Sequence, residues 1–284
     1  MNTFHRIYRD IVEFGRMSSP RGKAIIEMEN YSFTLQPRER FTSFTPRKLN
    51  LDYVKEEFLW YLRADPTDAL VTESAQMWKD LRQPDGSFLS NYGLYWFNQP
   101  GIYRPDGSMA QSGFAWVIDS LLADKDSRQA VIPMLRKEHL YPKNPDIVCT
   151  YAVGFRIRNN QLNMSVNMRS QDAVWGMSND IPCFSFLHEM VYVVLRDTKY
   201  YDLRMGAYNH KVDSLHVYER HFEMLGALAS SDVEYYSVDC PEIYDANEAM
   251  RLIDLADNQE PMSEHLFTAW LQDNRYKRAR NETT

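Results

Sequence analysis

The feature that most constrains the fold is a pair of adjacent strands followed closely by a long apolar segment. Residues 149–157 and 161–168 flank a short polar turn, and apolar and polar side chains alternate along the second strand. A period of two is typical of a strand with one buried face. Residues 183–195 are apolar on nearly every side, as in a helix enclosed by the protein. The sequence therefore predicts a β-hairpin whose sheet packs against a buried helix.

The other periodic segments are mostly helical and do not alternate regularly with strands. Residues 51–62 and 112–122 have the apolar spacing of helices, and residues 1–17 form an amphipathic helical pattern. Residues 214–225 fit a strand followed by a helix. Because no βαβ repeat connects these elements, we expect an α+β protein with helices packed on a mixed sheet.

Length and composition indicate one domain over residues 1–284, with a disordered tail at about 275–284. Of the 284 residues, 44% are hydrophobic and 13% aromatic, which is enough for a large core. No segment approaches the ~20 apolar residues of a membrane span. The N-terminus lacks the apolar centre of a signal peptide. We therefore expect a soluble, cytoplasmic protein with no membrane partner.

The net charge and the positions of cysteine and histidine argue against nucleic acid, disulfides and metal ions. A net charge of −7 disfavours nucleic acid, because its binding requires a basic surface. His216 and His221 are five residues apart, so they do not share a helix face as the ligands of HExxH do. The cysteines are odd in number and widely spaced, so we expect reduced thiols and no metal site. They are Cys149, Cys183 and Cys240.

Residues 167–180 gather polar chemistry at the point where the second strand ends. Arg169 and Ser170 supply the planar donors and the hydroxyl that bind a phosphate well. Asp172 and Asp180 supply acceptors for the amino or ring N–H groups of a heterocycle. Together they would form a nucleotide site. The alternative is a charged loop on the surface.

Two further residues have a structural and a chemical interpretation. Cys149 lies in an apolar strand and is either a small core residue or a nucleophile. It would become reactive if cations such as Arg169, one hairpin away, lowered its pKa. Glu57 lies in an apolar helical segment and is either exposed or half-buried with a raised pKa. A raised pKa would suit proton transfer.

The order and spacing of these and other residues resemble the thymidylate synthase family over about residues 16–225. The resemblance is strongest to the deoxycytidylate hydroxymethylase branch of T-even phages. It implies an α+β homodimer, formed through the sheet, in which each subunit lends arginines to the other's phosphate site. The matching segments are Glu57 to Trp60, SNYG at 90–93, DSR at 126–128, Cys149, RSQD at 169–172, Gly176, Asn179 with Asp180, and SLHVY at 214–218.

The resemblance also implies a role for each matched residue. Cys149 would be the nucleophile, and Glu57 and Tyr92 would handle protons and an ordered water. Asp180 would contact the pyrimidine base. The phosphate would be bound by Arg21, Arg128, Arg169 and Ser170, the sugar 3′-hydroxyl by His216 and Tyr218, and the folate by Trp78, Asp172 and Gly176.

Three positions depart from the usual pattern of thymidylate synthases. Gln129 replaces the second of two arginines given across the interface, and Lys23 or another cation would have to compensate. Thr150 follows the nucleophile where thymidylate synthases usually carry histidine. Asp180 stands where uracil-using members carry asparagine. The last two departures favour the hydroxymethylase branch.

The resemblance therefore implies 5-hydroxymethylation of dCMP, with 5,10-methylenetetrahydrofolate as cofactor and a covalent cysteine adduct at C6. Hydroxymethylation of CMP or dUMP, or reductive methylation, is an alternative within the same family. A nucleotide-binding protein that keeps the fold without turnover is an alternative of another class, and Gln129 is the feature that favours it.

Overall fold

The computed structural model describes residues 2–98, 102–103, 109–110, 112–255 and 265–281. Seven strands form its central mixed sheet: β1 (Arg16–Ser18), β2 (Ile25–Leu35), β6 (Val131–Pro133), β7 (Thr150–Arg158), β8 (Gln161–Met168), β9 (Gln171–Asp172) and β10 (Arg204–Tyr218). Their order across the sheet is β1-β2-β10-β8-β7-β6, with β9 beside β10. Strand β10 is parallel to β8 and antiparallel to β2, and β7 and β8 are antiparallel.

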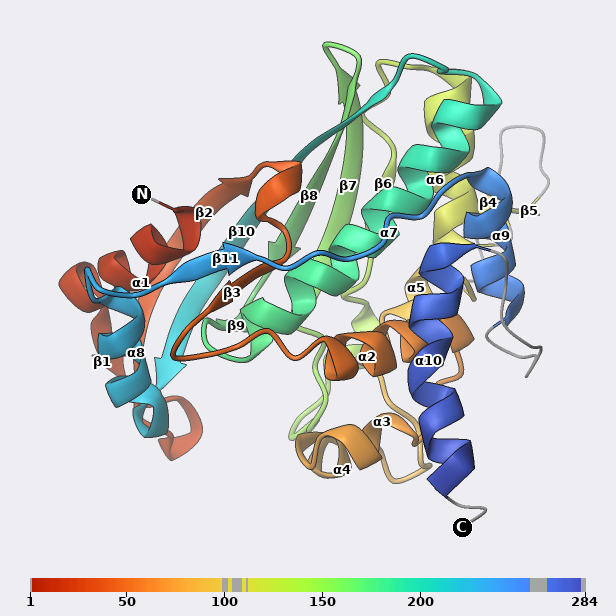
Figure 1. Ribbon diagram of the computed structural model, residues 1–284. Helices are drawn as coiled ribbons and strands as arrows, with labels where there is room; N and C mark the ends of the chain where they lie inside the picture. Colours follow the sequence, from red (N-terminus) through yellow and green to blue (C-terminus); the bar gives the residue numbers. More distant parts are fainter. Residues whose placement is uncertain (1, 99–101, 104–108, 111, 256–264, 282–284) are drawn as a thin grey trace.

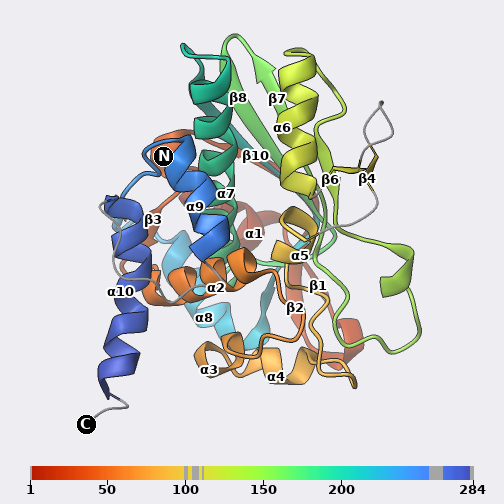
Figure 2. The same cartoon turned by 90° about the vertical axis from the view of Figure 1, so that its right-hand side faces the viewer.

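Helices cover one face of this sheet: Figure 1 shows α6 and α7 on its right-hand side, and Figure 2 shows them on the viewer's side of β7 and β8. Helix α7 packs at the centre and contacts α2, α6 and α9 as well as β10. The expected α+β arrangement of a mixed sheet with packed helices is confirmed. The helices are α1 (Thr3–Phe14), α2 (Leu51–Arg63), α3 (Val71–Ser74), α4 (Met77–Leu81), α5 (Gly93–Trp96), α6 (Gly113–Ala123), α7 (Gly176–Thr198), α8 (Phe222–Ala229), α9 (Ala246–Leu255) and α10 (Leu266–Asn281).

The predicted hairpin is present as β7 and β8. Asn159 and Asn160 form its two-residue turn with φ of 50° and 58°, a left-handed conformation that asparagine tolerates better than most residues. Along β8 the apolar side chains are buried and the polar ones between them are half-buried. The alternating pattern in the sequence therefore identified the strand and its buried face correctly.

The predicted helices at 51–62 and 112–122 correspond to α2 and α6, and side chains cap both. Asn50 accepts a hydrogen bond from the Tyr53 N–H at 3.2 Å, and Ser112 accepts one from the Ala115 N–H at 3.1 Å. Such caps satisfy N–H groups that have no partner within the helix. Residues 214–225 end β10, pass through a 3₁₀ turn at Glu219–His221 and enter α8, as expected.

Helix α7 is longer than the apolar segment at 183–195 that predicted it. It begins at Gly176, so the second half of the charged stretch is helical rather than a loop. The sequence-based boundary was wrong because the first turns carry polar residues such as Asp180, which interrupt the apolar pattern. These turns bring Asp180 next to Gln171 on the short strand β9.

The C-terminal helices pack against the helices that carry Glu57 and Asp180. Phe267 of α10 lies 5.0 Å from Phe186 of α7 and 6.2 Å from Phe58 of α2, measured between ring centroids. Helix α10 extends to Asn281, into the region 275–284 where a disordered tail is expected; residues 282–284 lie outside the described part. That expectation and the single-domain assignment stay predictions.

Three smaller features complete the described chain. Strand β3 (Thr42–Phe44) pairs with β11 (Tyr235–Ser237), and β4 (Ile102–Tyr103) pairs with β5 (Met109–Ala110). Further 3₁₀ turns occupy Pro20–Gly22, Pro37–Glu39 and Lys137–His139. Among the described helices, none is long and apolar enough to cross a membrane.

Candidate active site

Strand pairing brings Cys149 and Arg169 together. Thr150 of β7 is paired with Met168 of β8, so the residues just outside the two strands are neighbours. The Arg169 N–H donates to the Cys149 carbonyl at 2.8 Å, and Arg169 Nη2 lies 3.7 Å from Cys149 Sγ. A cation thus stands beside the candidate nucleophile, as the hairpin in the sequence indicated.

The backbone before Cys149 holds the Arg169 guanidinium in place. Its Nε donates to the Val148 carbonyl at 2.9 Å, and Nη2 donates to the Ile147 carbonyl. A guanidinium has five N–H donors, so further donors are left for an anion after these contacts. The fixed, half-buried side chain suits phosphate binding better than a freely rotating one would.

The half-buried Cys149 thiol does not have the lowered pKa that activation by cations alone would give. Burial raises its pKa; Arg169 and Arg21 oppose this, while Asp180 and Asp146 add to it. The net direction is upward, so the nearby cations do not lower the thiol pKa, which was the condition that the sequence set for a reactive Cys149. Desolvation outweighs the nearby positive charge.

Glu57 is buried on α2 and belongs to a cluster of phenols. Tyr61 donates a hydrogen bond to Glu57 Oε1 at 3.0 Å. Burial, with a smaller contribution from the Asp180 charge, raises the Glu57 pKa to about 8. The exposed alternative is therefore wrong: only 4% of Glu57 is accessible. Tyr92 lies next to Tyr61 and accepts a hydrogen bond from the Thr150 N–H at 3.2 Å, which connects this cluster to the start of β7.

Asp180 lies in the first turns of α7, where Gln171 Nε2 donates to its Oδ2 at 2.9 Å. Burial raises the Asp180 pKa to about 7; the Gln171 hydrogen bond opposes this rise and the Asp172 charge adds to it. The alternative of a solvated surface loop is wrong, because Asp180 is half-buried in a helix and bonded to a neighbour. Its electrostatic influence reaches both Cys149 and Glu57.

The end of β10 adds His216 and Tyr218 to the same region. Two positions apart, they point to one side of the strand, with ring centroids 5.0 Å apart. Burial lowers the His216 pKa. Burial raises the Tyr218 pKa, and the charges of Arg21 and Cys149 also act on it. Arg21 is exposed in the turn at Pro20–Gly22 with φ of 54°. Its charge acts on the pKa of Cys149, so it lies on the same side of the molecule as the candidate nucleophile.

The structure does not bring Arg128 to Cys149 of its own chain. Arg128 and Gln129 are exposed in the loop between α6 and β6. The neighbouring Ala130 carbonyl accepts from the Phe155 N–H at 2.8 Å, towards the far end of β7. At ~3.3 Å per residue, that point is roughly 20 Å along the strand from Cys149.

The three residues matched to folate positions have different surroundings. Asp172 accepts from the Val174 N–H at 2.9 Å, and Gly176 begins α7 beside it. A methyl group at Gly176 would lie 3.5 Å from Asp172 Cβ and 3.7 Å from Asp180 Oδ2. Trp78 is buried, donates to Tyr53 Oη at 3.0 Å and packs edge-on against Trp60. Asp172 and Gly176 thus border Asp180, whereas Trp78 belongs to a separate aromatic cluster with Tyr53 and Trp60 of α2.

Comparison with known proteins gives the family. A sequence model of the family described as Thymidylate synthase matches residues 2–239, which is most of the chain. The chain belongs to the thymidylate synthase family. The match extends beyond the resemblance at residues 16–225 in both directions. It supports transfer of a one-carbon unit to a pyrimidine nucleotide.

Three phage enzymes are among the curated proteins that are similar to this chain. The deoxycytidylate 5-hydroxymethyltransferases of Enterobacteria phages T4, T2 and T6 are each 28% identical to the chain over 185 residues. These alignments cover 62% of this chain and 71% of each relative. The resemblance to the hydroxymethylase branch is therefore confirmed as a similarity.

The sequence interpretation missed a cation–aromatic pair next to the folate-matched residues. The buried Arg47 guanidinium lies 4.3 Å from the ring of the exposed Trp175, and its Nη2 donates to Asn179 Oδ1 at 3.5 Å. Burial lowers the Arg47 pKa, and the Asp172 charge opposes that change. No local pattern predicts this pair, because 128 positions in the sequence separate its members.

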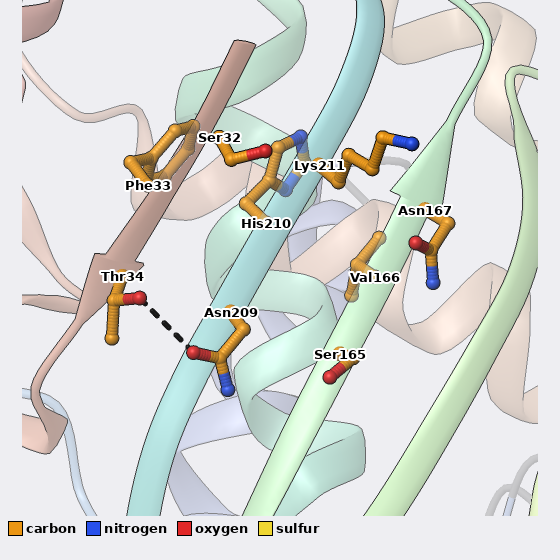
Figure 3. A pocket seen from close by; sticks show the side chains of 9 residues that line it. All are labelled: Ser32, Phe33, Thr34, Ser165, Val166, Asn167, Asn209, His210 and Lys211. Atoms are coloured by element: carbon orange, nitrogen blue, oxygen red, sulfur yellow. Dashed lines mark hydrogen bonds between the residues drawn. The ribbon is translucent and has the colours of Figure 1, made fainter. Parts of the chain in front are cut away.

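A hollow of about 270 Å³ lies on the sheet itself, and none of the matched residues lines it (Figure 3). Exposed Ser32 and Thr34 of β2 alternate with buried Phe33, so the hollow opens on the face without helices. Thr34 Oγ1 donates to Asn209 Oδ1 at 3.0 Å across its floor. Its lining is Ser32, Phe33, Thr34, Ser165, Val166, Asn167, Asn209, His210 and Lys211.

Among the residues that the structure describes, no group of three His, Cys, Asp or Glu side chains could hold a metal ion.

Proposed function

We propose that the protein converts dCMP into 5-hydroxymethyl-dCMP, with 5,10-methylenetetrahydrofolate as the one-carbon donor. The observation that carries this proposal is the half-buried carboxyl group of Asp180, which has a pKa of about 7. Its charge raises the pKa of both the Cys149 thiol and Glu57. The similarity to phage deoxycytidylate 5-hydroxymethyltransferases supports the same base.

Asp180 favours cytosine because of the groups on the edge of each base. Cytosine presents an amino donor at C4 and an unprotonated ring nitrogen. A carboxylate accepts from the amino group, and with a proton it also donates to the ring nitrogen. Uracil instead presents a carbonyl at C4, which would face an ionised carboxylate. A buried polar group without a partner costs ~1–3 kcal/mol, so this contact supports a preference of roughly ten- to a hundredfold.

The rest of the nucleotide would be held by residues around Cys149. Arg169, with Ser170 and the exposed Arg21, would bind the phosphate, and His216 and Tyr218 would bind the 3′-hydroxyl. We propose a homodimer formed through the open face of the sheet, in which Arg128 serves the partner's site. The distance of Arg128 from its own nucleophile supports this arrangement, since a phosphate contact within one chain would require it to be near Cys149.

The residues beside Asp180 suit a folate. Asp172 offers a carboxylate, Gly176 leaves room next to it, and the exposed Trp175 ring with Arg47 offers an aromatic surface and a cation. Asp172 and Gly176, with Trp78 further out, would hold the folate. The folate supplies a one-carbon unit to C5 of the base.

The chain's own side chains would act on the pyrimidine. The Cys149 thiol gives up its proton, and its sulfur forms a bond to C6 while the C5–C6 double-bond electrons move to C5. C5 would then bond to the one-carbon unit and lose its proton, and the bond between that carbon and the folate would break with its electrons going to the folate. Water would add to the resulting exocyclic carbon. Glu57, with its pKa about 8, can take the proton of that water. Breaking of the sulfur–C6 bond restores the double bond and frees Cys149.

The test is incubation with dCMP and methylenetetrahydrofolate, followed by mass spectrometry of the nucleotide. We expect a mass gain of one CH₂O unit and tetrahydrofolate without dihydrofolate absorbance. Dihydrofolate would indicate reductive methylation instead, and a panel with CMP and dUMP would reveal another nucleotide. No product from folded protein would refute the proposed activity.

A binding protein without turnover is the second candidate, favoured by Gln129 in place of an arginine. Tight binding of dCMP without release of tritium from C5-labelled nucleotide would identify it.

A further inference from the structure

Gln171 has no role in the site so far, although its side chain is committed to Asp180. It lies on β9, where its backbone pairs with Leu215 of β10. Only 3% of Gln171 is accessible, its Nε2 donates to Asp180 Oδ2 at 2.9 Å, and its Oε1 is buried without a partner among the described residues. A buried acceptor without a partner costs free energy. If position 171 served only to fill the core, an apolar side chain would therefore be more stable there than glutamine.

We propose that Gln171 is a positioning residue that occupies one oxygen of Asp180, so that the other is presented as an acceptor to the substituent at C4 of the base. The proposal rests on the function proposed above and adds the residue that makes Asp180 discriminate between cytosine and uracil.

The geometry fixes the direction of this contact. An ionised carboxylate only accepts hydrogen bonds, so the amide must turn its N–H towards Asp180 and leave Oε1 unused. A methyl group at Gly176 would lie 3.7 Å from Asp180 Oδ2 and 3.8 Å from Gln171 Cγ. The start of α7 therefore lies next to this pair. Gln171 thereby holds Asp180 through Oδ2, and Oδ1 would be the oxygen that meets the nucleotide.

The charges around Asp180 explain why a donor is needed there. The Gln171 hydrogen bond lowers the Asp180 pKa, against burial and the Asp172 charge. An ionised Asp180 rejects the uracil carbonyl, whereas a protonated one can donate to it, so the hydrogen bond preserves discrimination. The ionisable groups whose interactions with Asp180 the structure records are acids: Asp172 on β9, Glu57, Tyr53 and Tyr61 on α2, Tyr92 before α5, Cys149 before β7, Cys183 on α7 and Tyr208 on β10.

The test compares Gln171→Met, which keeps the length of the side chain without its amide, with wild type. Gln161→Leu, at the far end of β8, is the control for loss of a strand glutamine. The first readout is the titration of Asp180 in the free protein by carboxyl ¹³C NMR. We expect its pKa to rise by about one unit in Gln171→Met and to stay unchanged in the control.

The second readout is the ratio of kcat/KM for dCMP to that for dUMP at pH 8. We expect at least a twofold fall in Gln171→Met, since a pKa rise of about one unit alone roughly halves the ionised fraction of Asp180 at pH 8, and no change in the control. An unchanged ratio and titration would overturn the role of Gln171 while the dCMP activity of wild type stands. A wild type that does not distinguish the two nucleotides would overturn both proposals. If Gln171→Met does not fold, Gln171→Asn, one methylene shorter, decides by the same two readouts.

Discussion

Replacing Asp180 by asparagine is the sharpest test of how this site selects its base. The change keeps the size of the side chain and an oxygen that can accept the Gln171 hydrogen bond, now 2.9 Å long. It removes the negative charge and puts an N–H donor where Oδ1 was. That donor suits the uracil carbonyl and opposes the cytosine amino group.

The expected size of the effect follows from this exchange of partners. One donor–acceptor pair becomes a mismatch worth ~1–3 kcal/mol, so the ratio of kcat/KM for dCMP to that for dUMP should fall roughly ten- to a hundredfold. Release of tritium from C5-labelled nucleotides measures both values. The control is Ser178→Ala, two residues earlier on α7. The Ser178 hydroxyl donates to the backbone carbonyl of Val174, so the change removes a polar group of α7 without altering the carboxyl group of Asp180. An unchanged ratio in Asp180→Asn would refute the assignment of Asp180 as the residue that distinguishes cytosine from uracil.

Four further outcomes follow from the same geometry. Cys149→Ser should abolish turnover while dCMP binding, measured by calorimetry, persists; product formation would contradict a nucleophilic role. Glu57→Gln should slow product formation at least tenfold more than tritium release from C5, and equal slowing would argue against a role in hydration. Arg128→Ala should weaken dCMP binding about tenfold, and mixing it with Cys149→Ala should restore activity if the arginine crosses the interface; inactive mixed dimers would exclude that. The preference for dCMP over dUMP should fall as pH drops from 8 to 6, because Asp180, with a pKa of about 7, loses its charge over that range. A constant ratio of the two kcat/KM values would show that selectivity does not depend on the ionisation of Asp180.

The sequence predicted those parts of the fold in which one residue pattern had one structural meaning. The alternation along residues 161–168 identified β8, and the Asn–Asn turn fixed its hairpin with β7. That hairpin alone placed Arg169 beside Cys149, since antiparallel pairing determines which residues meet. The boundary of α7 was missed because Asp180 and its neighbours face the site and break the apolar pattern.

The pKa values could not be predicted in the same way. Arg169 beside Cys149 left open whether cations lower the thiol pKa, and in the structure burial raises it. Burial depends on residues distant in the sequence, as does the Arg47–Trp175 pair. The charge pattern in a sequence therefore indicates which groups meet, but not how much water remains around them.

The region after residue 239, which the family match does not cover, packs on the helices that carry Glu57 and Asp180. Phe267 of α10 packs on Phe58 of α2 and Phe186 of α7. Phe58 follows Glu57 directly, and Phe186 lies on the helix of Asp180. The segment thus packs on the two helices that carry Glu57 and Asp180, and desolvation is the largest cause of the raised pKa of each carboxyl group. A C-terminal segment that contributes none of the matched residues therefore packs against the helices on which both carboxyl groups of the proposed site lie.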